Sequence, residues 1–157
     1  MAKITTVCRP EFIHVTYIAS TPEKVWGALT SGDMTRQYFF GRRVESDWRV
    51  GSPVTYLRDN DELDIEGKVL ACEPPRVLSF TWHVPEDKTP RERPTRVTFE
   101  LKPMGATVKL TVRHEDLLPG DYFYDTDTFK GLNNGWPAII SNLKSLLETG
   151  KPLHLAA

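Results

Sequence analysis

The stretch GWPAIISNLKSLLETG, residues 135–150, carries the strongest helical pattern in the chain. Apolar side chains recur there at steps of three and four residues, which is the spacing of one face of an amphipathic helix. Gly150 is a candidate for the residue that ends this helix. The apolar face starts upstream of the quoted stretch and comprises Phe129, Leu132, Trp136, Ile139, Ile140, Leu143, Leu146 and Leu147. The sequence therefore predicts one long C-terminal helix with a single apolar face.

Pro137 leaves two placements open for the start of this helix. If the helix begins near residues 126–127, Pro137 lies inside it, removes one backbone hydrogen bond and should cause a kink. If Asn134 is the N-cap instead, Pro137 lies in the first turn, where no intrahelical partner is lost. The apolar residues upstream of Trp136 favour the longer, kinked helix.

Most of the remaining chain shows the two-residue period of strands. A first strand over residues 12–19 places Ile13, Val15 and Tyr17 on one face, with His14 on the other. Two short helical segments follow, at about 21–29 and 33–41. Short connections favour antiparallel pairing in chain order for the later strands. Those strands are expected at 44–48, 53–58, 63–72, 77–84, 96–102 and 107–114.

A seven-stranded antiparallel sheet with one apolar face needs a cover, and the C-terminal helix is the one long amphipathic element that can supply it. We therefore predict an α+β fold in which a curved sheet wraps around that helix. A twisted sheet that curves around a helix leaves space toward one end, where the two short helices could form a lid. The sequence thus indicates a cavity between sheet and helix.

Several motifs in this order resemble the SRPBCC (START-like) superfamily, and most closely its branch named after the activator of the heat-shock protein 90 ATPase. They are TPEKVW at 21–26, CEPPRVLSFTW at 72–82, the Gly135–Trp136 pair, and Leu143 with Leu146 and Leu147. The resemblance covers roughly residues 13–148. It implies a helix-grip fold with a deep apolar cavity between the sheet and the long helix.

The name of that branch does not transfer its function. The eukaryotic co-chaperone is similar in this domain but also has an N-terminal module that grips the chaperone, whereas this chain begins almost directly at the first strand. Chaperone activation and a chaperone partner are therefore not expected, because function is taken from sites and not from a fold.

The composition describes an ordinary globular protein. The 157 residues carry a net charge of -1, with 26% charged and 39% hydrophobic residues, which fits one domain over 1–157 with a core at about 12–149. Interspersed charges without a basic stripe argue against nucleic-acid binding. No apolar run approaches a membrane span, and Cys8 and Cys72 are expected to be reduced thiols, so we expect a cytoplasmic location.

No catalytic group, metal site or cofactor is predicted. The four histidines His14, His83, His114 and His154 stand singly, and no metal-ligand spacing occurs. His114 differs from the other three histidines, because it lies on the same face of its strand as the apolar residues and could face the cavity. A satisfied inner-face histidine is the preferred interpretation.

The leading functional hypothesis is binding of a small, mostly hydrophobic ligand, a lipid or an aromatic metabolite, in the cavity. The candidate ligand-binding residues are Phe39, Phe40, Tyr56, Trp82, Phe99, Tyr122, Phe129, Leu132, Trp136 and Ile140. One alternative is an enzyme of the polyketide cyclase or dehydratase type using His114, Tyr56 or Glu66. Another is a stress-related protein-interaction module. Between monomer and homodimer the sequence leaves the choice open, because an edge strand of the sheet could pair with a second copy.

Overall fold

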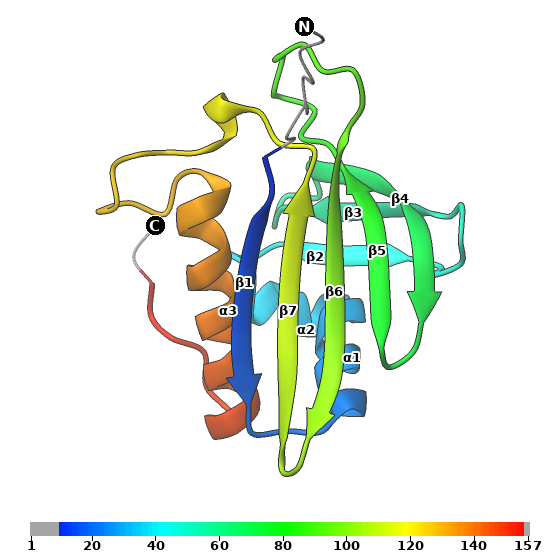
Figure 1. The fold of residues 1–157 in the computed structure, drawn as a ribbon, viewed down its shortest axis with the longest axis vertical. Helices are drawn as coiled ribbons and strands as arrows, with labels where there is room; N and C mark the ends of the chain where they lie inside the picture. The colour runs from blue at the N-terminus through cyan, green and yellow to red at the C-terminus, as the bar shows by residue number, and fades with distance from the viewer. Residues whose placement is uncertain (1–9, 156–157) are drawn as a thin grey trace, which may run out of the picture.

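An antiparallel sheet of seven strands is the largest element of the computed structural model, which describes residues 10–155 (Figure 1). The strand order is β1-β7-β6-β5-β4-β3-β2, so strands β2 to β7 neighbour one another in chain order and β1 joins the sheet beside β7. The strands are β1 (Phe12–Ile18), β2 (Arg43–Ser46), β3 (Pro53–Leu57), β4 (Leu63–Glu73), β5 (Val77–Trp82), β6 (Thr95–Met104) and β7 (Thr107–Glu115). The predicted seven strands and their antiparallel pairing are confirmed.

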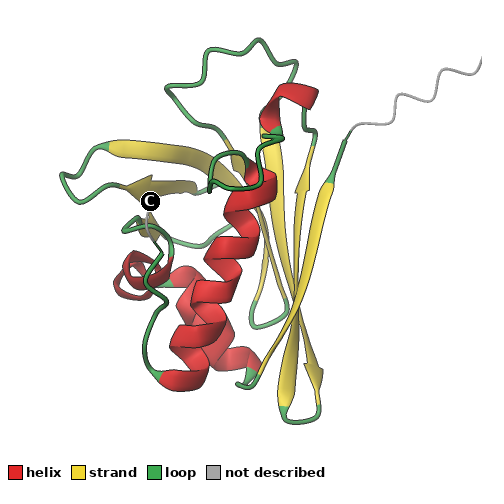
Figure 2. Ribbon diagram, turned by 90° about the vertical axis from the view of Figure 1, so that its left-hand side faces the viewer, coloured by secondary structure: helices red, strands yellow, loops and turns green. Residues whose placement is uncertain are grey.

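The helices are α1 (Pro22–Thr30), α2 (Gly32–Tyr38), the short 3-10 helix η1 (Pro119–Asp121) and α3 (Leu132–Thr149). Thr21 caps α1, since its hydroxyl accepts a hydrogen bond from the backbone N–H of Lys24 at 3.2 Å. Gly150 ends α3 in a left-handed conformation with φ 83°. α3 packs along one face of the curved sheet (Figure 2). This arrangement confirms the α+β helix-grip fold.

The start of α3 differs from both placements considered for the sequence. The helix begins at Leu132, so Phe129 stays in the preceding loop, and Asn134 is not its N-cap. Gly131 precedes it with φ 80°, and a Cβ on Gly131 would lie 2.6 Å from Cβ of Phe123. This backbone conformation lies outside the right-handed helical region, so the helix starts after Gly131, and the close approach of Phe123 favours glycine there. Pro137 does lie inside the helix, as the first placement required.

The closed end of the space between α3 and the sheet is filled by aliphatic side chains. Leu143 of α3 is fully buried, and Val108 and Leu110 of β7 are also fully buried in the same hydrophobic cluster. Ile18 and Val25 extend this cluster toward α1 and are again fully buried. This half of the interior is a continuous apolar core.

The outward face of β1 is the apolar one. Ile13, Val15 and Tyr17 are 45%, 43% and 48% exposed, whereas Ile18, the last residue of the strand, is fully buried. Alternation in the sequence identifies the two faces of a strand, but the side on which α3 packs determines which face is inside.

The absence of a membrane span and the state of the two cysteines were also predicted from the sequence. Within residues 10–155 no helix is long and apolar enough to cross a membrane. Cys72 carries a half-buried free thiol, and Cys8 lies outside the described residues.

Candidate functional site

A cavity of about 300 Å³ lies at the open end, between the start of α3 and the upper ends of β5, β6 and β7. Apolar side chains form most of its wall: Phe39, Trp82, Val84, Leu117, Leu132, Trp136 and Ile139. The polar part of the wall consists of His83, Asp87, Arg91, Thr95, His114 and Asp121. α1 and α2 contribute no side chain to this wall beyond Phe39, which directly follows α2, so the expected lid of two short helices does not cover this cavity.

Aromatic rings fill the interior behind the cavity. Phe39 lies with its ring centroid 4.9 Å from that of Tyr56, and Trp82 lies 5.4 Å from Trp136. Phe99 meets Trp136 edge to face at 5.8 Å. Such ring contacts add to the stabilisation from burial. The deep cavity implied by the resemblance is thus reduced to a chamber at one end.

A chain of hydrogen bonds crosses the cavity wall from α3 to β5. The indole Nε1 of Trp136 lies 3.0 Å from Nδ1 of His114. Nε2 of His114 lies 2.8 Å from the Thr95 hydroxyl, which donates to the backbone carbonyl of Trp82 at 2.9 Å. Because an indole N–H can only donate, Nδ1 of His114 must accept, and its proton must be on Nε2. Every donor in the chain is therefore matched, and both ring nitrogens of His114 are already bonded within the protein.

His114 is neutral in this environment. Its side chain is 3% exposed, and burial lowers its pKa from the usual 6.5 to about 4. The Asp121 carboxylate raises that pKa and the Arg91 guanidinium lowers it, but both are smaller influences than burial. At neutral pH the imidazole is a satisfied inner-face side chain, which is the preferred interpretation of the sequence.

Arg91 lies in the cavity wall and is bonded there to two aspartates. Its guanidinium donates to both carboxylate oxygens of Asp121, 30 residues further along the chain, and to Asp87 at 2.9 Å. Hydrogen bonds from Thr89 and then from Arg91 lower the pKa of Asp87 to about 2. Burial opposes ionisation of Asp121, but hydrogen bonds from Arg91 and from the Leu118 N–H outweigh it and lower its pKa.

This triad changes the interpretation of the loop at residues 85–94. Its prolines and charges predict a solvated hairpin tip, yet the Arg91 side chain is only 15% exposed, as is that of Asp121. The loop is tied to η1 and forms one wall of the cavity.

The structure separates the ten candidate ligand-binding residues into three groups. Phe39, Trp82, Leu132 and Trp136 line the cavity. Tyr56, Phe99 and Ile140 are at most 2% exposed and lie in the core beside it. The others lie outside both: Phe40 and Phe129, whose rings pair at 5.7 Å beside a separate hollow, and Tyr122, whose hydroxyl donates to the Glu11 carbonyl at 3.2 Å.

The groups proposed for catalysis do not converge. Tyr56 is buried in the core, and burial raises its pKa above the usual 10. Glu66 lies outside the cavity wall and pairs with Nδ1 of His83 at 3.2 Å. His114 alone of the three faces the cavity. Within residues 10–155 no three His, Cys, Asp or Glu side chains gather in a way that could hold a metal ion.

Several wall residues carried no signal in the sequence. Arg91 and Asp121 look like ordinary loop charges, because their pairing depends on the fold. Thr95 opens β6 after a proline-rich loop and resembles any strand residue. Gly135 lines the cavity, where an added Cβ would meet nothing nearer than the Phe129 carbonyl at 3.6 Å.

Comparison with known proteins identifies relatives of the whole fold. The family described as Activator of Hsp90 ATPase homolog 1-like protein matches residues 19–148. The protein MLL2253 from Mesorhizobium loti is 25% identical, with a TM-score of 0.71, covering 88% of this chain and 96% of its own. A search of curated proteins finds no match.

Two further structures show the same fold at lower identity. The Aha1 dimer from Colwellia psychrerythraea is 22% identical, with a TM-score of 0.70, covering 90% of this chain and 98% of that one. PFC0360w from Plasmodium falciparum, described as an HSP90 activator, is 18% identical with a TM-score of 0.67, covering 87% of this chain and 95% of that one. Dimerisation is stated for the Colwellia protein, and chaperone activation is stated for the Plasmodium protein.

Proposed function

The chain belongs to the family of Activator of Hsp90 ATPase homolog 1-like proteins, and from this premise we propose that it binds a small, mostly apolar molecule in the cavity at the start of α3. Family and fold are consistent with ligand-binding and with polyketide cyclase-like proteins. The choice between those two roles rests on the chemistry of the cavity wall.

One observation carries the proposal: most of the cavity wall is apolar, and its polar side chains already have hydrogen-bond partners within the protein. His114 and Thr95 are satisfied within their chain, and the Arg91 guanidinium is held by Asp87 and Asp121. A ligand would thus meet mainly the surfaces of Trp82, Leu132 and their apolar neighbours, and its binding would come from burial of apolar area.

The volume of the cavity narrows the ligand class. About 300 Å³ lies at the lower end of the range for small-molecule sites, which is roughly 300–1,000 Å³. The volume suits an aromatic metabolite or a short acyl chain better than a complete membrane lipid.

The same wall argues against acid–base catalysis. A general base needs a free lone pair within hydrogen-bond reach of the substrate. On His114 the lone pair of Nδ1 receives the Trp136 N–H, and Nε2 carries the proton. Catalysis by this imidazole would first require breaking one of those bonds, so we rank the cyclase-like alternative second.

Gly135 offers a direct test, because a side chain added there projects from α3 at the cavity. Its φ is not positive, and an added Cβ has ordinary contact distances, so alanine should be accommodated, whereas a leucine side chain reaches further into the cavity. We expect affinity for the neutral probe N-phenyl-1-naphthylamine to fall from wild type to Gly135→Ala and to be lost in Gly135→Leu. Probe fluorescence measures the affinity, and urea unfolding measures stability.

Gly27→Ala is the matched control. Gly27 also lies within a helix, α1, and has nothing within 4 Å of an added Cβ, but it does not line the cavity. It should leave probe affinity unchanged. Equal probe binding by wild type and a folded Gly135→Leu variant would refute the proposed site.

A further inference from the structure

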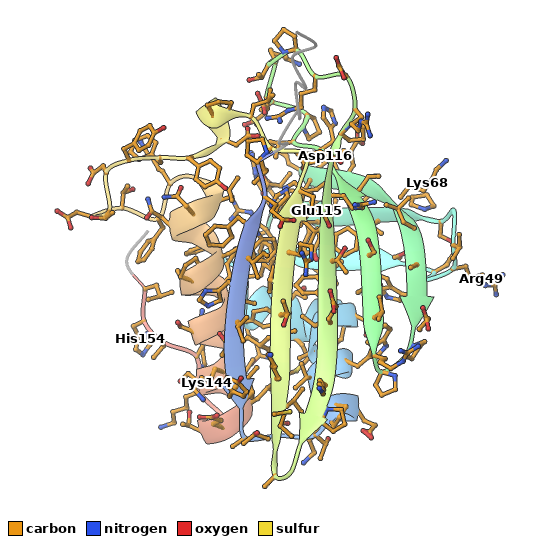
Figure 3. The ribbon with its side chains drawn as sticks, in the orientation of Figure 1. Arg49, Lys68, Glu115, Asp116, Lys144 and His154 are labelled. Carbon is orange, nitrogen blue, oxygen red and sulfur yellow. The ribbon has the colours of Figure 1, made fainter. Side chains whose placement is uncertain are left out.

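β1 is an edge strand whose outer edge is only partly covered. On one side it pairs with β7 (Figure 1), and on the other side three isolated hydrogen bonds reach it. Figure 3 labels Lys144 on α3, which makes one of them. The ammonium group of Lys144 on α3 donates to the carbonyl of Tyr17, and the Glu148 carboxylate accepts from the N–H of Ala19. Near the other end, the hydroxyl of Tyr122 donates to the carbonyl of Glu11.

These bonds identify which backbone groups point away from the sheet. In an antiparallel pair, residues alternate between those whose N–H and C=O both face the partner strand and those whose groups both face away. Glu11, Tyr17 and Ala19 bond to groups outside the ladder, and all three have the same parity. Ile13 and Val15 share that parity, so their backbone groups also point to the open edge.

Within the part of the chain that the structure describes, the middle of this edge is therefore uncovered. Among residues 10–155, no hydrogen bond joins the outward N–H and C=O of Ile13 or Val15 to another group. Both side chains are apolar and more than two-fifths exposed. Sheet edges are commonly protected by charge, proline or a covering element, and here Lys144 and Glu148 supply charge only beside the last residues of β1.

We propose that this edge pairs with β1 of a second copy, in antiparallel orientation around a two-fold axis at His14. In that register Ile13 of each copy lies opposite Val15 of the other, and their outward groups form four backbone hydrogen bonds. Each pair is reciprocal: Ile13 of one copy faces Val15 of the other, and Val15 of the first faces Ile13 of the second. The register therefore has the two-fold symmetry that a homodimer interface requires. The two sheets then join into one continuous sheet.

Charge agrees with this register. Glu11 of each copy comes opposite Tyr17 of the other, and Tyr17 is flanked by Lys109 on β7 and bonded to Lys144 on α3. The Glu11 carboxylate, which lies 3.4 Å from Arg113 of its own chain, thus approaches Lys109 of the other copy, while Lys144 is already paired with Glu148 at 2.7 Å. Stacking of the outer faces fits less well, because Lys109 and Arg113 lie next to the apolar stripe and would have to be desolvated.

Proline at position 15 tests the pairing. The Val15 N–H points away from β7, so Val15→Pro removes no bond of the sheet, and proline is accepted on edge strands in that orientation. By symmetry it removes two bonds from the dimer. We expect a dimer in wild type, measured by sedimentation over a concentration series, with a dissociation constant at least about tenfold higher in the variant. Val15→Lys, with its backbone donor intact, is the second variant and should also weaken the dimer.

Thr111→Lys is the control that separates edge pairing from face stacking. Thr111 lies opposite Val15 on β7 and presents its side chain to the same outer face, one strand in from the edge. Edge pairing predicts an unchanged dissociation constant. A monomer at every concentration in wild type, a dimer unaffected by Val15→Pro in a folded variant, or a dimer dissociated by Thr111→Lys would each overturn the proposal.

Discussion

The two ends of the space between α3 and the sheet are built from the same elements, but one end is a packed core and the other is a cavity. At the closed end Leu143 lies among aliphatic side chains of the core cluster and is fully buried. One turn earlier on the same helix, Ile139 lines the cavity, next to Gly135 and across from His114. The packing of helix on sheet supplies the space, and the side chains facing it decide whether it becomes core or a binding chamber.

Truncating one residue at each end should give the largest effect. Leu143→Ala is expected to lower the free energy of unfolding by about 2–5 kcal/mol, because it opens a void in a close-packed core. Ile139→Ala should cost less, since its side chain already borders a cavity, but should weaken probe binding. Urea unfolding measures the stability of both variants, and probe titration measures their affinity. If Leu143→Ala and Ile139→Ala lowered stability equally and affinity equally, the two ends would not differ in the way described.

Trp136→Phe tests the hydrogen-bond chain at the open end. The smaller ring leaves a gap, and Nδ1 of the buried His114 loses its donor, so we expect a loss of about 3 kcal/mol. In a double-mutant cycle with Thr95→Val, which cuts the chain at its next link, the two losses should not add. Additive losses would mean that the chain does not act as a unit.

Acidification should destabilise the open end before the closed one. His114 has a pKa of about 4 when folded and about 6.5 when unfolded. Its contribution to stability is complete above pH 6.5 and is lost as the pH falls toward 4, because the unfolded chain then binds the extra proton. Between pH 7 and pH 5 we expect a loss of about 2 kcal/mol, measured by urea unfolding at each pH.

His114→Gln is the control for that measurement. Its stability at neutral pH will differ from wild type, but its decline between pH 7 and pH 5 should be smaller by the same amount. An identical decline in both proteins would assign the pH dependence to other groups, such as His14, whose pKa burial also lowers.

Asp87→Asn should have the smallest effect on stability. Asp87 is 33% exposed and shares Arg91 with Asp121, so loss of its charge should cost less than about 1 kcal/mol. The loop at 85–94 should then hold the cavity mouth less tightly, with faster association of the probe in stopped-flow fluorescence. Asp33→Asn, on the exposed surface of α2, is the charge-matched control.

The parts of this molecule that could be predicted are those with a local pattern. The period of α3 and the alternation of Val97, Phe99 and Leu101 arise from one element packing on another, and each is visible in a few consecutive residues. The start of α3 was missed because Phe123 crosses at Gly131, a contact between residues that no periodicity joins.

The cavity was harder to place for the same reason. The sequence identifies aromatic residues that face inward, but it does not show that Tyr56 and Phe99 would pack against other rings while Trp82 kept a free surface. The position of Arg91 in the cavity wall depends on a partner 30 residues away. On β1, both faces carry groups that can be buried, so only the position of α3 distinguishes them.

The series of hydrogen bonds from Trp136 to the Trp82 carbonyl also holds α3 against the sheet. It runs from α3 through β7 and β6 to β5, across the direction of the strands, and connects the helix to three strands by three successive hydrogen bonds. Moving α3 away from the sheet would stretch this connection and break at least one of its bonds. Widening the chamber on this side therefore costs at least one hydrogen bond of the buried His114, which itself lines the wall.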